Sequence, residues 1–244
     1  MNIRTVPIAL IREERQYRAV LAVGQNNIDE EAQYLTHLHP NERRQYERYG
    51  SEKRRLSYLL GRLAAKHAIS QLAQQRSLKS IWIDKGVFEF PVVKGSNLQN
   101  IQVSISHSDN LGLSVAYPED HPMGVDIEKI NKSRIKAILS QLTNQEKSLL
   151  ENLELDNIAI YTAFFSIKEA LSKVIHTGMM LNFNYLEIRE ITYTSPTLSC
   201  LFANFGQYKA RAWIGKDYVF SIVLPRKTSA DFSSFWQILS EWQV

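Results

Sequence analysis

The 244-residue chain is predicted to form an α+β fold of two similar subdomains related by a pseudo-twofold axis. Each subdomain is expected to hold a long helix and shorter helices packed on a small, mainly antiparallel sheet. Two observations predict this fold. The length allows two domains of ordinary size, and each half contains strands, then helices of which the last is the longest, then more strands. The subdomains are expected over residues 1–118 and 123–225, followed by a tail, 226–244. We find no sequence identity between the halves, so their similarity is one of order alone.

The composition is that of a globular protein with a sizeable core, because 44% of the residues are apolar and 22% are charged. A net charge of +4 favours anionic partners such as phosphates, but it is too small to indicate nucleic-acid binding. The single Cys200 excludes an internal disulfide and a cysteine-based metal cluster, which favours a reducing compartment. With no signal peptide and no run of 18 apolar residues, we expect a cytoplasmic protein that does not span a membrane.

The first half begins with two predicted strands, 6–11 and 19–23, and a predicted helix over 28–38. Pro40 ends that helix, and Asn41 is placed to cap the next one. A long helix is then predicted over residues 51–75, with Ser51 at its cap.

The basic residues of this long helix gather mainly toward its N-terminal end. The candidates for binding an anionic ligand are Lys53, Arg54, Arg55 and Arg62. Free backbone amides and the helix dipole favour anions at this end. The pattern fits either a phosphate site or the solvated face of a surface helix.

Four strands are predicted after the long helix, over residues 80–84, 88–93, 101–105 and 111–117. The third of them alternates apolar and polar residues, as half-buried strands do. It runs into Ser106-His107-Ser108, a group of small polar side chains at the end of a strand.

The second half opens on a short strand, Gly124-Val125-Asp126-Ile127-Glu128. Successive residues of a strand point to opposite faces, so Asp126 and Glu128 are expected to share one face and Val125 and Ile127 to enter the core. Two carboxylates about 4 Å apart repel each other by roughly 4 kcal/mol at an effective dielectric constant of 20. Such a pair raises a pKa, binds a cation, or stays solvated at the end of the strand.

Helices and then strands are predicted for the rest of this half. The predicted helices are 132–139, 143–152 and 155–175, and the predicted strands are 185–192, 197–203, 208–214 and 218–224. Thr143 and Glu146 match a capping box at the start of the second helix. The tail has helical spacing of large apolar residues, which predicts a short helix docked on the body or, as the alternative, a helix that binds a partner.

Glu169 and Lys173 lie four residues apart on the long helix 155–175, so they share one face. As a surface pair they would contribute only about 0.2–0.5 kcal/mol. Together with Asp126 and Glu128, however, Glu169 completes a set of three carboxylates. Such a set suits a hard cation such as Mg²⁺, which leaves positions for water and a substrate phosphate.

Two motifs about forty residues apart resemble the signature motifs of the 4′-phosphopantetheinyl transferases. They are Gly124-Val125-Asp126-Ile127-Glu128 and Phe165-Ser166-Ile167-Lys168-Glu169-Ala170-Leu171-Ser172-Lys173. Val103-Ser104-Ile105-Ser106-His107-Ser108 is similar to a third family motif. The length resembles that of the larger, surfactin-type group, whose members are monomers of two similar halves, more than that of the shorter, trimeric holo-acyl-carrier-protein synthases.

The resemblance implies transfer of the phosphopantetheine arm of coenzyme A to a serine of an apo acyl or peptidyl carrier protein, with release of adenosine 3′,5′-bisphosphate. It implies that Asp126, Glu128 and Glu169 hold Mg²⁺ against the pyrophosphate. Glu169 would be the base for the carrier serine, directly or through a metal-bound water. Lys173 would neutralise the leaving phosphate. Ser106 and His107 would contact the coenzyme A phosphates.

Three positions differ from the family pattern. Phe165 stands where many members have tryptophan. Phe88-Glu89-Phe90-Pro91 occupies the place of a common Gly-Lys-Pro segment, and Thr177-Gly178-Met179-Met180 replaces a Gly-x-Gly-Leu run. The apolar segment 179–183 is expected in the core, with a docking surface for the carrier as the alternative.

Two other functions compete with this interpretation. One is an Mg²⁺-dependent phosphohydrolase that uses the same carboxylates. The other is a non-catalytic basic module that binds nucleic acid, against which stands the absence of any recognisable nucleic-acid motif.

Overall fold

The computed structural model describes residues 1–26, 31–151 and 157–242, which divide into two compact units. Unit 1 comprises Met1–Pro122 and Ser229–Phe235, and unit 2 comprises Met123–Thr228 and Trp236–Val244. The described residues form seven α-helices and antiparallel sheets, so the α+β prediction is confirmed. The assignment of separate functions to residues 1–118, 123–225 and 226–244 stays a prediction.

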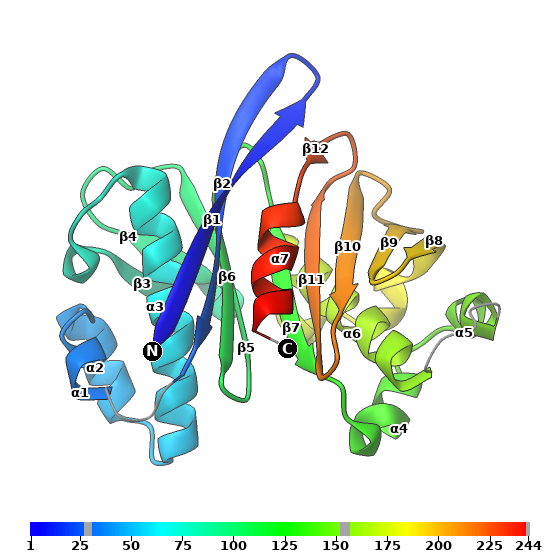
Figure 1. The fold of residues 1–244 in the computed structure, drawn as a ribbon, viewed down its shortest axis with the longest axis horizontal. Helices are drawn as coiled ribbons and strands as arrows, with labels where there is room; N and C mark the ends of the chain where they lie inside the picture. Colours follow the sequence, from blue (N-terminus) through cyan, green and yellow to red (C-terminus); the bar gives the residue numbers. More distant parts are fainter. Residues whose placement is uncertain (27–30, 152–156, 243–244) are drawn as a thin grey trace. The chain divides into compact units, whose positions relative to one another are not determined.

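Unit 1 is built on a five-stranded antiparallel sheet that one long helix covers (Figure 1). In spatial order its strands are β12 (Ser229–Ala230), β1 (Asn2–Arg12), β2 (Arg15–Gln25), β6 (Leu111–Pro118) and β5 (Ile101–Ser108). Helix α3 (Glu52–Ala73) packs along β1, β2, β5 and β6. Its buried face meets apolar residues of the sheet, so the core of the unit lies between helix and sheet. As predicted, the Ser51 side chain caps α3 by accepting a hydrogen bond from the Arg54 amide.

The shorter elements of unit 1 are α1 (Glu31–Leu35), α2 (Pro40–Glu47), β3 (Trp82–Lys85) and β4 (Pro91–Lys94). Residues 28–30 of the helix predicted over 28–38 lie outside the described residues. The predicted cap Asn41 is wrong: His39 caps α2, and its Nδ1 accepts a hydrogen bond from the Asn41 amide at 3.2 Å. The reason is Pro40, which occupies the first helical position and so moves the cap back by two residues.

The strand predicted over 88–93 is also partly wrong. Val87–Glu89 forms a 3₁₀ turn instead, and the strand begins only at Pro91. Phe88 and Glu89 have positive φ angles of 59° and 63°, which are incompatible with an extended strand. Apolar composition alone did not reveal this turn.

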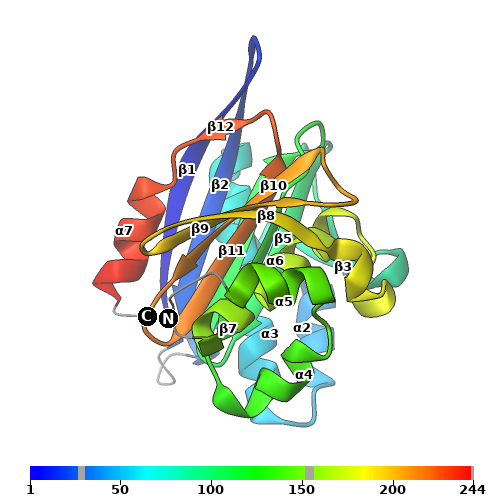
Figure 2. The same ribbon diagram turned by 90° about the vertical axis from the view of Figure 1, so that its right-hand side faces the viewer.

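Unit 2 has its own five-stranded antiparallel sheet. In spatial order its strands are β7 (Gly124–Lys129), β11 (Tyr218–Pro225), β10 (Tyr208–Ile214), β9 (Thr197–Phe202) and β8 (Ile188–Thr194). The helices are α4 (Ile135–Leu139), α5 (Asn144–Glu151), α6 (Asn157–Val174) and α7 (Ser233–Glu241). Helix α7 is divided between the units, because its residues up to Phe235 belong to unit 1 and those from Trp236 onward to unit 2. Helices α4 and α5 lie beside α6 in both ribbon views (Figures 1 and 2). The apolar core of the unit forms where α6 packs on the sheet.

Predicted features of unit 2 are mostly confirmed. Thr143 and Glu146 form the capping box: the Thr143 amide donates to Glu146 Oε2 at 2.8 Å, and the Glu146 amide donates to Thr143 Oγ1 at 3.2 Å. Residues 155 and 156 of the predicted long helix lie outside the described residues. In the apolar segment 179–183, Phe183 is buried in the core whereas Met180 is exposed.

Each unit contains the same buried ion pair at the same place in its fold. In unit 2 the Lys168 ammonium of α6 binds Glu146 Oε2 at 2.6 Å and the Gln141 carbonyl at 3.1 Å, and Glu146 Oε1 accepts from the Ile188 amide at 3.0 Å. Both side chains are fully buried. Lys168, in the middle of a motif expected to carry chemistry, therefore ties α6 to α5 and β8.

In unit 1 the Lys66 ammonium of α3 binds Glu42 Oε2 and the His37 carbonyl in the same way. Glu42 Oε1 accepts from the Ile83 amide at 3.0 Å, and its other oxygen closes the capping box with His39. The carbonyl that binds the lysine lies five residues before the glutamate in both units. The halves are thus internally similar in detail.

Equivalent strands of the two units also pair in the same register. Ser114 of β6 lies opposite Ala22, and Ser221 of β11 lies opposite Asp126. Pro118 and Pro225 end these two strands and pair with Ile101 and Tyr208, the first residues of β5 and β10. Sequence similarity between the halves is therefore present, contrary to our expectation: the clearest pairs are Lys66-His67-Ala68-Ile69-Ser70 with Lys168-Glu169-Ala170-Leu171-Ser172, and Leu113-Ser114-Val115 with Phe220-Ser221-Ile222.

We expect Glu146→Gln to lower the free energy of unfolding by about 3–5 kcal/mol, because it leaves the Lys168 ammonium buried without a counter-charge. Glu151→Gln is the matched control, since Glu151 is exposed on the same helix and should change stability by less than about 0.5 kcal/mol. Urea unfolding of the full chain measures both. A loss below about 1 kcal/mol for Glu146→Gln would contradict a structural role for the pair.

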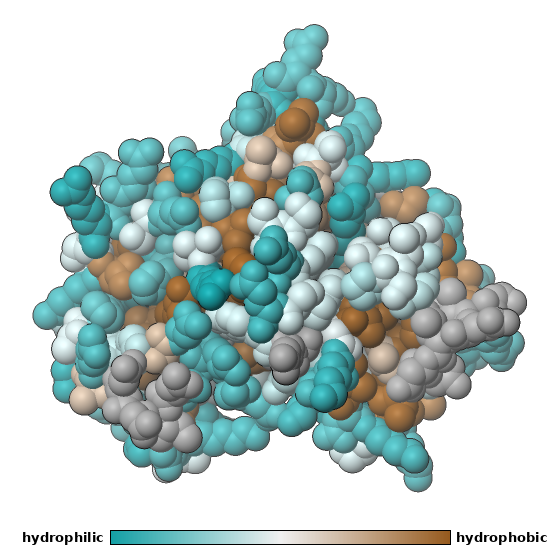
Figure 3. All heavy atoms as spheres, viewed as in Figure 1, coloured by the Kyte–Doolittle hydropathy of each residue, from teal (hydrophilic) through white to brown (hydrophobic). Residues whose placement is uncertain are grey.

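No described helix combines the length and the apolar character that a membrane span requires. On the face drawn in Figure 3, hydrophilic side chains cover most of the outer end of the β1–β2 hairpin.

Candidate functional site

The predicted acidic residues of unit 2 lie where β7 and α6 approach each other most closely. Gly124 makes this approach possible, because a Cβ atom there would lie 2.1 Å from the Ala170 carbonyl oxygen of α6. Real Cβ atoms do not come so close, so a side chain at this position would push helix and strand apart. The glycine that opens the first motif thereby brings Asp126 next to the second motif.

Asp126 and Lys173 are in direct contact across this junction. The Lys173 ammonium donates to Asp126 Oδ1 at 2.7 Å and to the Val125 carbonyl at 3.0 Å. The Asp126 side chain is buried, whereas that of Lys173 is 24% exposed. A pair of Lys173 and Glu169 on the helix surface was one of two interpretations of the sequence, but in the structure Lys173 pairs with Asp126 of the strand.

Glu128 is bound by Arg134, a residue that we did not single out from the sequence. The Arg134 guanidinium forms an ion pair with Glu128 and lies 5.4 Å from the centre of the Phe165 ring. Phe165 in turn contacts Phe183, with 5.6 Å between ring centres. The aromatic residue that opens the second motif thus supports a cation of the acidic site. Nothing in the local sequence pairs residues 134 and 165, so only the fold reveals this contact.

The carboxylates of this group affect one another. Burial raises the pKa of Glu128 to about 7, and the charge of Asp126 adds to the effect, while Arg134 and Lys173 oppose it. Burial and then the Asp126 charge also raise the pKa of Glu169, against the effects of Lys173 and Arg134. Asp126 therefore acts electrostatically on both glutamates. Asp126 and Glu128 lie on the face of β7 that α6 covers, and not on a solvated face.

The donor chemistry of this group fits a hard divalent cation, because three carboxylates with mutually unfavourable charges are what such an ion neutralises. In the structure, the cationic groups beside Asp126 and Glu128 are those of Lys173 and Arg134. Within residues 1–26, 31–151 and 157–242, no three acidic, histidine or cysteine side chains are arranged to hold a metal ion. The metal set Asp126, Glu128 and Glu169 stays a prediction.

Unit 1 carries a separate cavity of about 440 Å³ between α3, the β3–β4 segment and β5. The residues that line it are Tyr49, Arg54, Ser57, Tyr58, Gly61, Arg62, Lys85, Glu89, Pro91, Ile105 and His107. Four of them carry or can carry a positive charge, which suits an anionic ligand. The volume lies in the range of small-molecule sites.

Arg62 and Tyr58 are neighbours in the cavity wall. The Arg62 guanidinium lies 5.0 Å from the centre of the Tyr58 ring, and burial raises the pKa of Tyr58 to about 12. Arg62 Nη1 is buried and has no hydrogen-bond partner among the described residues. A buried guanidinium nitrogen is costly to leave unpaired, so it is a ready donor for a ligand. Gly61 leaves room, since a Cβ there would lie 3.2 Å from Ile105.

The structure thus places three of the predicted coenzyme A residues of this half, Arg54, Arg62 and His107, around one cavity. Three others do not line it. Ser106 points to the opposite face of β5 from His107, Lys53 is exposed and pairs with Asp109 at 3.8 Å, and Arg55 lies off the cavity face of α3. Lys85 also lines the cavity, a residue that we did not single out from the sequence. The helical spacing of Arg54, Tyr58 and Arg62 was the signal that could have identified the cavity face.

Comparison of the two units shows that neither polar site is required by the shared fold. We aligned the units through Lys66 with Lys168 and through the strand registers. In unit 1, the residues equivalent to Asp126, Glu128, Glu169 and Lys173 are Ala22, Gly24, His67 and Gln71, in that order. In unit 2, the residues equivalent to Tyr58, Gly61, Arg62, Ile105 and His107 are Ile160, Ala163, Phe164, Ala212 and Ile214. These apolar residues belong to the unit 2 core or pack against it. The acids and the cavity are therefore specialisations of one unit each.

Residues 122–223 match the family model of the 4′-phosphopantetheinyl transferase superfamily. The matched segment contains the acidic site and almost the whole sheet of unit 2. No curated protein matches the chain.

Proposed function

We propose that the chain transfers the 4′-phosphopantetheine group of coenzyme A to a serine hydroxyl of an apo carrier protein and releases adenosine 3′,5′-bisphosphate. The family match supports a phosphopantetheinyl transferase in general. The observation that carries the proposal for these residues is the acidic group on β7 and α6. The same fold in unit 1 has neutral residues or histidine there, so the acids serve chemistry rather than folding.

The reaction places a clear demand on the site. The serine oxygen bonds to the phosphorus that carries the pantetheine, the bond from that phosphorus to the bridging oxygen breaks, and the serine proton must be accepted. Catalysis of such a transfer is mostly positioning and neutralisation of charge. In the proposal Glu169 accepts the proton, and Lys173 neutralises the phosphate of the leaving group. When bound, Mg²⁺ would add positive charge at the pyrophosphate, held by Asp126, Glu128 and Glu169.

The cavity of unit 1 suits the nucleotide end of coenzyme A. Arg54, Arg62 and His107 provide cationic donors for its phosphates, and the rings of Tyr49 and Tyr58 provide flat apolar surface. His107 would bind the 3′-phosphate of coenzyme A. Ser106, Lys53 and Arg55 do not line the cavity, and they remain candidates for contacts with coenzyme A outside it. We further propose that the chain is a monomer of the larger, surfactin-type group and acts in the cytoplasm.

The decisive experiment incubates the protein with coenzyme A, Mg²⁺ and a panel of apo acyl, peptidyl and aryl carrier proteins, followed by intact mass measurement. The expected result is a mass increase of one phosphopantetheine group on at least one carrier, lost when its acceptor serine is replaced by alanine. Release of adenosine 3′,5′-bisphosphate without any carrier would instead identify a phosphohydrolase. Binding of random DNA without modification of any carrier would favour a basic binding module.

A further inference from the structure

Ser221 of β11 carries a buried hydroxyl beside the acidic group. It lies directly opposite Asp126 in the pairing of β11 with β7, so the two side chains share the face of the sheet that α6 covers. The residue is fully buried, and among the described residues its hydroxyl has no hydrogen-bond partner. A buried hydroxyl that forms no hydrogen bond is destabilising, so its presence calls for an explanation.

The neighbours of Ser221 point to one candidate partner. Val219 and Val223 lie before and after it on the same face of β11, and Ala212 of β10 lies opposite it on the other side. These three residues belong to the apolar core of unit 2. Among the four described residues that surround Ser221 on this face of the sheet, Asp126 alone has a side chain that accepts a hydrogen bond. Cross-strand neighbours have Cβ atoms about 4.5–5.5 Å apart, a distance that a serine hydroxyl and a carboxylate can bridge.

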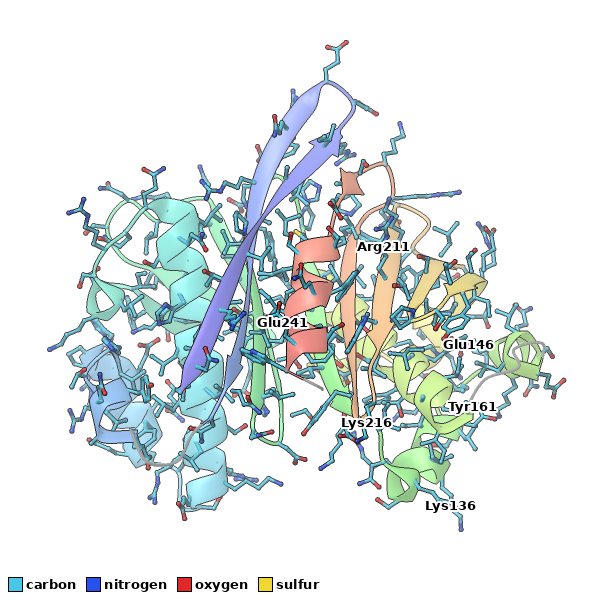
Figure 4. The ribbon with its side chains drawn as sticks, viewed as in Figure 1. Lys136, Glu146, Tyr161, Arg211, Lys216 and Glu241 are labelled. Carbon is cyan, nitrogen blue, oxygen red and sulfur yellow. The ribbon has the colours of Figure 1, made fainter. Side chains whose placement is uncertain are left out.

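Solvent does not account for this hydroxyl. On the adjoining strand the charged side chain lies on the other face: Arg211, which Figure 4 labels on β10, alternates with Ala212 and so points away from α6. Ser221 therefore lies in the apolar layer between helix and sheet, with a carboxylate as its polar neighbour.

Unit 1 has the same serine without the acid. Ser114, the equivalent of Ser221, is also fully buried, and its hydroxyl has no partner in the part of the chain that the structure describes. Its cross-strand neighbours are Ala22 and Ile105, whose side chains cannot accept a hydrogen bond. The serine thus belongs to the shared fold, and only in unit 2 does a carboxylate lie opposite it.

We propose that Ser221 is a positioning residue for Asp126, and that its hydroxyl donates a hydrogen bond to this carboxylate in the working enzyme. In the structure the Lys173 ammonium holds Asp126 Oδ1 at 2.7 Å. In the proposed reaction Lys173 turns to the leaving phosphate, so Asp126 loses this donor and needs another to keep its orientation. Removing such an outer-shell donor typically changes metal affinity by about 10–100-fold. The inference rests on the proposed function, in which Asp126 holds Mg²⁺.

The test measures the affinity of the full chain for Mn²⁺, with coenzyme A present and no carrier protein, from the electron paramagnetic resonance signal of free Mn²⁺. Ser221→Ala should weaken this affinity by about 10–100-fold, whereas Ser221→Thr keeps the hydroxyl and should retain most of it. The thermal unfolding midpoint of Ser221→Ala should be equal to or higher than that of the unmodified chain, because the variant removes a buried hydroxyl that lacks a partner. A purely structural serine would not give a loss of affinity without a loss of stability.

Ser114→Ala is the matched control, because it removes the equivalent hydroxyl from unit 1 and should leave Mn²⁺ affinity unchanged. Asp126→Ala tests the premise and should weaken Mn²⁺ binding strongly. If Asp126→Ala weakens binding but Ser221→Ala does not, or if Ser114→Ala matches Ser221→Ala, the inference is overturned while the proposed function stands. If the unmodified chain binds no Mn²⁺, or Asp126→Ala binds it normally, the proposed metal set fails and the role of Ser221 fails with it.

Discussion

Asp126→Ala and Glu169→His are each expected to reduce phosphopantetheine transfer by at least about 10²–10⁴-fold, which is the range that a catalytic acid or base contributes. The physical reason is that each variant removes a carboxylate from the group that Asp126 joins to the two glutamates. The replacements are the residues that unit 1 carries at the equivalent positions, Ala22 and His67, and unit 1 forms the same arrangement of helix and sheet with them. The measurement is the initial rate of carrier modification, followed by mass.

Two controls separate a loss of chemistry from a loss of structure. Asp217→Ala removes an exposed acid from the same unit and should leave the rate unchanged. The circular dichroism spectra and thermal unfolding of the Asp126 and Glu169 variants should remain close to those of the unmodified chain. The reason is that the Lys173 ammonium still donates a hydrogen bond to the Val125 carbonyl and is partly exposed to solvent. Turnover within a few fold of normal from either variant would rule out the acidic group as the catalytic site.

The second large effect is expected from Arg62→Phe and His107→Ile, which introduce the residues that fill the same positions in unit 2, namely Phe164 and Ile214. Each should weaken coenzyme A binding by about 10–100-fold, because a charge-assisted hydrogen bond to phosphate contributes about 1.5–3 kcal/mol. Isothermal titration of the full chain with coenzyme A measures the change.

The pattern of the losses is as informative as their size. If His107 binds the 3′-phosphate, His107→Ile should weaken coenzyme A binding but leave binding of 3′-dephospho-coenzyme A nearly unchanged. Arg76→Gln removes an exposed cation of unit 1 outside the cavity and serves as the control. Equal losses from Arg62→Phe and Arg76→Gln would show that only the net charge matters, which contradicts a specific site in this cavity.

Much of the acidic site could be predicted from the sequence because its determinants are local. The alternation of a short strand puts Asp126 and Glu128 on one face, and helical spacing puts Glu169 and Lys173 on another. Close packing at Gly124 then joins the two elements. What could not be predicted was the partner of each charge, since Arg134 and Glu128 meet through the path of the chain after β7.

The cavity of unit 1 was predicted less well for the same physical reason. Its wall combines α3 with Lys85 and Glu89, next to the left-handed turn at Phe88, and with His107 of β5. These three segments are far apart in sequence. A basic helix end indicated an anion site, but not which of its cations face inward. Ser106 and His107 are neighbours in sequence, yet strand alternation sends them to opposite faces.

The amino-acid sequence by itself determined the fold class, the long helices, the capping box of Thr143 and Glu146, and the two motifs that carry the acids. These are short-range properties, set by periodicity and by hydrogen bonds within a few residues. Only the tertiary structure showed that Lys66 and Lys168 form equivalent buried ion pairs. It also showed that unit 1 carries the cavity and unit 2 the acidic site, at different positions of the same arrangement of helices and strands. Burial and cross-strand register depend on contacts between distant segments, so they become defined only when the chain has packed.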